Sequence, residues 1–224
     1  MEEGTGEEQE MKPFEYFNYM KGLKYRTVGD GVDYLVERKE DGSLEIFFQE
    51  SNGAVDWRTN FNFFPPARSH RDPTSKAYTS ESITWHRGFY RAWQSAETSV
   101  LLDVGREWDG SSKIKVIGWS YGGAMALLCA WAVNRYFGVK CDVLTFGAPK
   151  IVRGYREHLV LMSKLGYVEQ YANYNDIVTY VVPFKHWEHV FAFRVGDERI
   201  SIRKLLKPST YHCMYGEEAI YKED

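Results

Sequence analysis

The chain has 224 residues, a length that fits one medium-sized domain with a substantial core. Its formal net charge is −3 and its sequence pI is about 6.1, which gives no reason to expect nucleic acid or an anionic membrane as a partner. The three cysteines are too few and odd in number for a disulfide framework, so they favour a reducing compartment.

Residues 1–10 are acidic and polar, the opposite of a secretory signal peptide. The longest apolar run, residues 124–133, is too short to span a bilayer. We therefore expect a disordered acidic tail over residues 1–10 and a single domain over residues 11–224. We also expect a cytoplasmic protein that is not exported by a cleaved signal.

The first part of the domain is predicted to hold a helix and a hairpin. Apolar residues recur at helical spacing over residues 14–23 and indicate a short amphipathic helix. Two β-like runs, residues 32–37 and 44–49, flank the turn at residues 40–43 and predict an antiparallel hairpin. Residues 67–80 are polar and rich in turn residues, so we expect a surface loop there.

Strands and helices alternate through the rest of the chain. An apolar stripe predicts a helix over residues 88–108, and a short strand over residues 113–117 precedes a buried helix over residues 124–136. Further strands are predicted over residues 143–146, 167–174, 178–182 and 189–195, and further helices over residues 155–164, 200–206 and 215–221. This alternation predicts a parallel sheet with crossover helices.

The turn Gly118-Trp119-Ser120-Tyr121-Gly122 is a G-x-S-x-G motif between a predicted strand and a predicted helix. Strand and helix crowd together at such a turn, so glycines are needed on both sides of a strained central residue. The turn lifts the Ser120 hydroxyl above the sheet edge, at a helix N-terminus that favours negative charge. Ser120 is therefore the candidate nucleophile, and the alternative is a glycine-rich turn with an incidental serine.

A serine nucleophile needs a general base and a carboxylate that orients the base. In this type of site the acid and then the base follow the serine, on loops after later strands. Asp176 follows the strand predicted to end at residue 174 and fits best as the acid, the alternative being a turn aspartate beside Asn175. Asp142 starts a strand at the wrong edge, and Asp197 lies in what resembles an exposed turn.

Four histidines follow the serine, and they are His158, His186, His189 and His212. His212 follows a polar loop and precedes a predicted terminal helix, which suits a catalytic base. His189 opens an apolar strand and is the second candidate, whereas His158 lies in a helix pattern. The sequence His186-Trp187-Glu188-His189 also raises a metal site, but its spacing is not H-E-x-x-H and no third ligand is evident.

With these residues assembled, the chain resembles the class 3 (fungal-type) lipases of the α/β-hydrolase fold from about residue 44 to residue 215. Six segments carry the resemblance in order, and they are residues 48–60, 86–89, 118–123, 145–149, 175–178 and 212–215. The resemblance implies an α/β fold with a mostly parallel central sheet, flanked by helices and preceded by an N-terminal antiparallel hairpin.

The resemblance implies Ser120 as nucleophile, Asp176 as orienting acid and His212 as general base. It also implies an oxyanion hole formed by the backbone N–H groups of Ser51 and Tyr121.

By the same resemblance, His189 would be a structural histidine. Residues 52–62 would be a lid or acyl-contact segment, unless their aromatic side chains simply pack in the core. No cofactor and no metal is needed.

The implied function is a lipase-like serine carboxylic ester hydrolase, which cleaves an acylglycerol or a related lipid through an acyl-enzyme. Its partner would be a lipid or small-molecule ester, with transient contact with a lipid surface. The alternatives are a phospholipase or acyltransferase that uses the same site, and a catalytically idle lipase-like binding module.

Three residues depart from the family pattern. Glu50 stands where the family usually has glycine, and a carboxylate there would oppose charge developing on an oxyanion unless it points away. Trp119 and Tyr121 stand where histidine and leucine are usual. Tyr121 would contribute only its backbone N–H, and we expect Trp119 either to reshape the pocket or to pack against a neighbouring helix.

Overall fold

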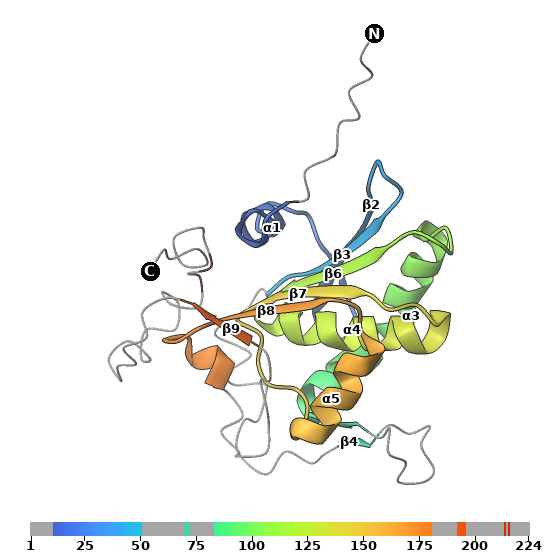
Figure 1. Ribbon diagram of the computed structural model, residues 1–224. Coiled ribbons are helices and arrows are strands. Elements are labelled where there is room, and N and C mark those ends of the chain that lie inside the picture. Colours follow the sequence, from blue (N-terminus) through green and yellow to red (C-terminus); the bar gives the residue numbers. More distant parts are fainter. Residues whose placement is uncertain are drawn as a thin grey trace.

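The computed structural model describes residues 11–50, 70–71, 83–180 and 192–195 and the single residues Cys213 and Tyr215. Its central feature is a seven-stranded sheet with the order β1-β2-β3-β6-β7-β8-β9 (Figure 1). The strands are β1 (Arg26–Val28), β2 (Val32–Arg38), β3 (Leu44–Phe48), β6 (Ile114–Trp119), β7 (Asp142–Phe146), β8 (Val168–Asn173) and β9 (Ala192–Val195). β1, β2 and β3 pair antiparallel, and all pairs from β3 to β9 are parallel. The predicted mostly parallel sheet with its N-terminal hairpin is confirmed.

Helices cover both faces of this sheet (Figure 1). One face carries α1 (Pro13–Met20), and the other carries α3 (Arg87–Glu107), α4 (Tyr121–Phe137) and α5 (Tyr155–Lys164). Each of these four helices lies where the sequence predicts one. Because α4 and α5 cross over between parallel strands, the carboxyl ends of β6, β7 and β8 meet at one edge of the sheet.

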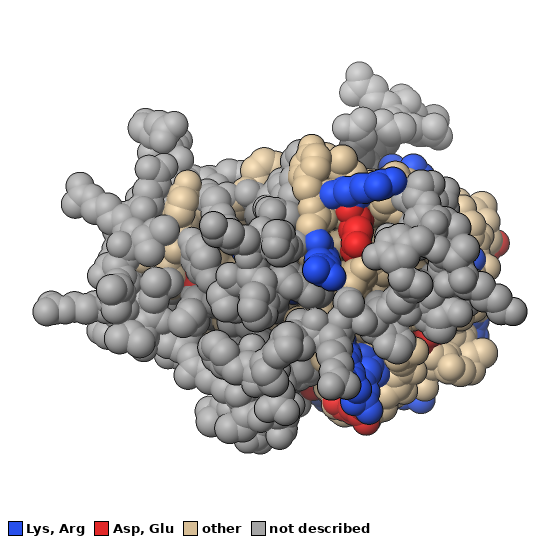
Figure 2. Space-filling model, turned by 90° about the horizontal axis from the view of Figure 1, so that it is seen from below, with Lys and Arg blue, Asp and Glu red and all other residues tan. Residues whose placement is uncertain are grey.

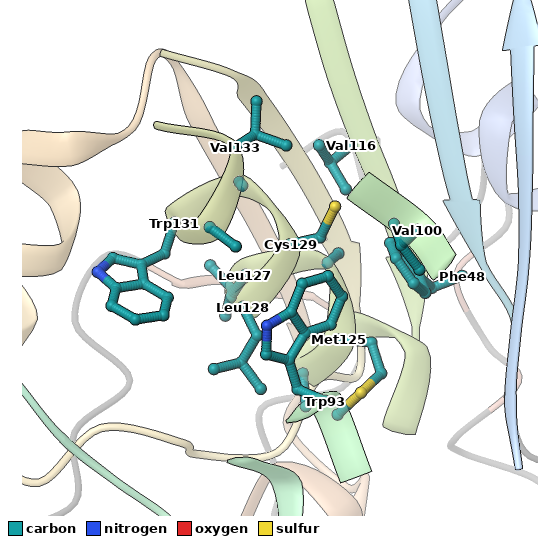
Figure 3. Close-up of a cluster of buried hydrophobic side chains, with 14 of the residues drawn as sticks. Phe48, Trp93, Val100, Val116, Met125, Leu127, Leu128, Cys129, Trp131 and Val133 are labelled. Atoms are coloured by element: carbon teal, nitrogen blue, oxygen red, sulfur yellow. The ribbon is translucent and has the colours of Figure 1, made fainter. Parts of the chain in front are cut away.

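The larger core lies between the sheet and the helices α3 and α4 (Figure 3). Trp93 and Val100 of α3 meet the side chains of α4 above strand residues such as Phe48 and Val116. Every residue from 121 to 133 of α4 is buried, as its apolar sequence predicts. Burial of one large apolar side chain contributes about 1.5–3 kcal/mol, so α4 is fixed firmly and its N-terminus has a defined place.

A smaller core lies under α1 on the opposite face. Phe17 and Met20 of α1 pack there among apolar side chains of β3, β6 and β7. Tyr16 anchors the same helix, since its hydroxyl donates a hydrogen bond of 2.5 Å to the Glu45 carboxylate of β3. The ammonium of Lys39 lies 2.8 Å from the same carboxylate and balances its charge.

One predicted strand is wrong over the part that the structure describes. Residues 178–182 read as β-like, but the structure has a 3-10 turn over Ile177–Tyr180, and residues 181–182 lie outside the described ranges. The Asp176 carboxylate accepts a hydrogen bond from the N–H of Val178 at 2.9 Å, and the backbone carbonyl of Asp176 accepts one from the Thr179 hydroxyl at 2.9 Å. These local bonds compete with strand pairing and turn the backbone.

Three short strands were not predicted. β4 (His70–Arg71) lies within the expected surface loop and pairs antiparallel with β5 (Thr84–Trp85), and β1 extends the hairpin by one strand. The strand expected over residues 189–195 is described as β9 only from Ala192 onward. The helix expected over residues 200–206 lies outside the described residues, as does all but Tyr215 of the one expected over residues 215–221.

Charged groups of both signs share the surface. On the face that Figure 2 shows, described Lys and Arg side chains lie beside described Asp and Glu side chains, with uncharged residues between them. This mixture agrees with the small net charge of −3. Of the helices that the structure describes, none is long and apolar enough to cross a membrane.

Candidate active site

Ser120 occupies the sharp turn between β6 and α4. Its φ of 58° and ψ of −126° make it the only non-glycine residue with positive φ in the part of the chain that is described. A side chain in this region of backbone space costs about 1–3 kcal/mol, so the surrounding packing must hold it there. The Ser120 N–H donates to the carbonyl of Phe146 at 2.8 Å, which ties the turn to the end of β7. The predicted strain at the central residue is confirmed.

Glycines let strand and helix approach closely around Ser120. A Cβ atom on Gly118 would meet the backbone of Gly122, and one on Gly123 would lie 2.6 Å from the Cβ atom of Ala148. Real side chains do not fit at such distances. The expectation that the elbow needs residues without a Cβ is therefore confirmed.

The residue after the serine, Tyr121, begins α4. The first N–H groups of a helix have no partner within it, and the helix dipole makes this end positive. The Tyr121 ring is buried, with its centroid 6.0 Å from that of Phe89, and burial raises the pKa of its hydroxyl. Its side chain thus belongs to the core, while its backbone N–H belongs to the helix end beside Ser120.

Asp176 follows β8 and is fully buried. Both of its carboxylate oxygens accept hydrogen bonds, Oδ2 from the Tyr215 hydroxyl at 2.7 Å and Oδ1 from the N–H of Val178 at 2.9 Å. A buried carboxylate is costly unless it is hydrogen-bonded, so these donors hold it in one orientation. Asp176 is thus a turn aspartate and also a buried carboxylate at the sheet edge.

Tyr215 received no role from the sequence. It is fully buried, and its hydroxyl accepts the N–H of Asn173 at 3.1 Å while it donates to Asp176. The signal that could have found it is its place three residues after His212, the predicted base. A tyrosine hydroxyl that is buried nearly always finds a hydrogen-bond partner.

Ser120 and Asp176 share one edge of the sheet. Ser120 follows β6 and Asp176 follows β8, with β7 between these two parallel strands. Ligands of open α/β sheets bind outside the carboxyl ends of the strands. Trp119 points to the opposite face, where its ring lies 5.4 Å from that of Phe17 of α1. It therefore packs against a neighbouring helix, the second of the two expectations for it.

Glu50 is partly buried just after β3. Burial and the negative charges of Glu50 and Asp176 raise the pKa of the Cys213 thiol, while the charge of Lys21 opposes them. Glu50 is therefore within electrostatic range of the residue that follows His212 in the chain. Whether the Glu50 carboxylate faces the oxyanion stays a prediction, because Ser51 and His212 lie outside the described residues.

The other candidates fall into two groups. Asp142 begins β7 at the opposite edge and accepts the N–H of Tyr167 at 2.8 Å, and His158 is buried in α5, both as predicted. The predicted residues that lie outside the described ranges are Ser51, residues 52–62, His186, His189, Asp197 and His212. The base, one oxyanion donor and the lid thus stay predictions. Among the residues that are described, no group of three or more His, Cys, Asp or Glu could hold a metal ion.

Comparison with known proteins gives one family. Residues 46–186 match the family model described as Lipase (class 3). A curated relative, Lipase A of Sodiomyces alcalophilus, is 28% identical over 139 residues, which are 58% of this chain and 33% of the relative. The chain thus spans about a third of that relative's length.

Solved structures show the same fold. The native Rhizomucor miehei lipase propeptide complex superposes with a TM-score of 0.60 at 20% identity, over 78% of this chain and 56% of that chain. The lipase from Rhizopus microsporus var. chinensis superposes with a TM-score of 0.53 at 18% identity, over 71% of this chain and 55% of that chain. The α/β-hydrolase-like architecture is therefore shared, although this chain spans little more than half of either neighbour.

Proposed function

Because the chain belongs to the class 3 lipase family, we propose that it is a serine carboxylic ester hydrolase that cleaves an acyl ester of an acylglycerol or a related lipid. The observation that carries the proposal is the backbone of Ser120, which has a φ of 58° between a parallel strand and a buried helix. A glycine would adopt this conformation without strain, so a serine there argues for a role of its hydroxyl.

The proposed reaction begins at Ser120. Its Oγ attacks the ester carbonyl carbon while His212 takes the hydroxyl proton, and Asp176 orients the imidazole and stabilises its charged form. The negative charge on the carbonyl oxygen is received by the N–H groups of Tyr121 and Ser51. His212 and Ser51 enter here from the sequence alone.

The tetrahedral intermediate then collapses. The C–O bond to the alcohol breaks, the alcohol leaves with the proton from His212, and the acyl group stays on Ser120. Water attacks this acyl-enzyme while His212 takes one of its protons, and the free acid leaves as Ser120 recovers its hydroxyl. An acceptor alcohol in place of water would make the same site an acyltransferase.

The close contact between α4 and β3 supports the proposed oxyanion hole. A Cβ atom on Gly122 would lie 2.6 Å from the carbonyl oxygen of Gln49, so the end of β3 lies directly against the first turn of α4. Ser51 follows two residues later, beside the N–H of Tyr121 in the proposed arrangement. The presence of Glu50 favours the rival function, an idle binding module, because its charge opposes an oxyanion.

A fluorophosphonate probe tests the proposal, since it phosphonylates an activated serine. Intact-protein mass is measured for the wild type, for Ser120→Ala and for Ser163→Ala, which removes an exposed serine of α5. We expect one adduct on the wild type and on Ser163→Ala, and none on Ser120→Ala. A series of acylglycerols, phospholipids and short esters then separates lipase from phospholipase activity.

Two results would overturn the proposal. One is an adduct that persists in Ser120→Ala. The other is a folded wild type that takes no adduct and cleaves no ester, with or without detergent micelles. Tight lipid binding in that second case would establish the idle module.

A further inference from the structure

One side chain of α1 contacts three aromatic residues of the sheet region. Phe17 is 1% exposed, and its ring centroid lies 5.4 Å from that of Trp119, 5.1 Å from that of Phe146 and 5.5 Å from that of Tyr215. The interplanar angles are 82°, 55° and 69°, the edge-on and tilted arrangements that aromatic rings favour. Phe17 therefore packs against all three rings at once.

Each of these three rings adjoins a proposed catalytic residue. Trp119 directly precedes Ser120, and the carbonyl of Phe146 accepts the N–H of Ser120 at 2.8 Å. The hydroxyl of Tyr215 donates to Asp176 at 2.7 Å. Phe17 thus contacts Trp119, which adjoins the proposed nucleophile, and Tyr215, which bonds the proposed acid, on the face of the sheet that α1 covers.

The contact with Tyr215 has the clearest consequence, because a tyrosine hydroxyl moves with its ring. The ring of Tyr215 packs against those of Phe17 and Phe146, whose centroids are 5.5 Å and 5.9 Å away, and these two rings also contact each other at 5.1 Å. Its hydroxyl meets two groups at once, the N–H of Asn173 and Oδ2 of Asp176. A tilt of the ring would therefore lengthen the hydrogen bond to the carboxylate.

The helix that carries Phe17 is fixed independently of Tyr215. In the middle of the helix Tyr16 bonds Glu45 of β3, and at its carboxyl end the Tyr25 hydroxyl donates to the carbonyl of Met20 at 2.6 Å. The Tyr16 bond also provides a control, because its loss weakens the attachment of α1 while the ring contacts of Phe17 are kept.

We propose that Phe17 is a positioning residue, which acts through Tyr215 to hold the Asp176 carboxylate in the orientation that the base requires. Phe17 itself touches no reacting atom. The inference rests on the proposed function, because it concerns the acid of that site.

Loss of the Phe17 ring leaves a space into which Tyr215 can tilt. The carboxylate then loses a hydrogen-bond donor and can turn away from the orientation that the base requires. Because Asp176 orients the imidazole and does not bind the substrate, kcat should fall while KM stays nearly unchanged. Among the described residues, the charged or titratable groups that act on one another here besides Asp176 are Lys21 at the end of α1, Glu50 after β3 and Cys213. The Lys21 ammonium lies 3.8 Å from the centroid of the Phe17 ring, so Phe17→Ala also removes that contact, whereas Tyr215→Phe does not.

The test is a double-mutant cycle on kcat and KM, with a soluble p-nitrophenyl ester as substrate. The variants are Phe17→Ala, Tyr215→Phe and the double variant, with Phe17→Leu as a milder change if Phe17→Ala does not fold. We expect each single variant to lower kcat roughly tenfold and to leave KM nearly unchanged. The double variant should go no further than Tyr215→Phe, because both changes act on one hydrogen bond.

The control is Tyr16→Phe, which removes the bond from α1 to Glu45 and should lower Tm without lowering kcat. Additive effects in the cycle would overturn the inference. So would a Phe17→Ala variant that loses Tm but keeps the wild-type kcat, or a Tyr16→Phe variant that lowers kcat as Phe17→Ala does. If Ser120→Ala still hydrolyses the ester, the proposed function fails and this inference fails with it. If Ser120→Ala is inactive while the cycle is additive, only the role of Phe17 fails.

Discussion

The backbone of Gly122 lies so close to the end of β3 that a Cβ atom on Gly122 would stand 2.6 Å from the carbonyl oxygen of Gln49. The carbonyl of Phe48 would be closer still. These obstacles are backbone atoms, which cannot rotate away as a flexible side chain would. The first turn of α4 and the strand before the proposed oxyanion donor are therefore held at a separation that only glycine permits.

Gly122→Ala should push these two segments apart. We expect the free energy of unfolding to fall by about 1–3 kcal/mol. We also expect kcat to fall up to about 10²-fold, because a displaced N–H group no longer reaches the oxyanion at hydrogen-bond distance. Urea unfolding and ester kinetics measure the two effects.

Gly105→Ala in α3 is the matched control. A Cβ atom there would meet the Phe137 ring at 3.5 Å, an ordinary contact. Alanine is the better helix former, so this change should stabilise the protein by about 0.5–1 kcal/mol and leave kcat unaltered. If Gly122→Ala behaves like Gly105→Ala, the close contact does not limit activity.

Ser120→Gly should separate the backbone strain at Ser120 from the chemical role of its hydroxyl. Glycine adopts the positive φ of this position freely, so the free energy of unfolding of Ser120→Gly should be about 1 kcal/mol higher than that of Ser120→Ala. Both variants should lose the fluorophosphonate adduct. Thermal unfolding of the two proteins side by side gives the difference, and equal Tm values would show that the backbone at Ser120 carries no strain.

The elbow could be predicted because its cause is local: glycines, a strand and a helix are contiguous in the chain. The turn after Asp176 was misread because Val178 and its neighbours favour strands by composition. The deciding factor was the carboxylate of Asp176, which captures the Val178 N–H. The contact of Phe17 with Tyr215 could not be predicted, because these residues are far apart in the chain and no pattern in either segment indicates which residue the other one contacts.

Glu50→Gln tests the charge beside the site. The charge of Glu50 reaches Cys213, the neighbour of His212 in sequence. Removal of a negative charge near a developing oxyanion should raise kcat, by roughly threefold for a partly exposed group. The increase should shrink at high salt, because salt screens the wild-type repulsion. A fall in kcat would instead mean that Glu50 points away from the oxyanion and supports the site.

His86 should make stability depend on pH. It is 7% exposed at the start of α3, and burial lowers its pKa from the ordinary 6.5 to about 4. The folded state therefore keeps the imidazole neutral between these values, while the unfolded state takes up a proton. Above about pH 7 this group has no effect on stability. As the pH falls from 6.5 towards 4, the proton stabilises the unfolded state, so the free energy of unfolding falls.

The loss should reach about 3 kcal/mol near the lower limit, since each unit of pKa difference corresponds to 1.36 kcal/mol. His86→Gln cannot take up the proton, so its free energy of unfolding should fall less steeply over the same range. The measurement is urea unfolding of both proteins at several pH values, with the carboxylates acting alike in the two. A difference between them that stays constant from pH 7 to about pH 4 would show that His86 is protonated equally in the folded and unfolded states.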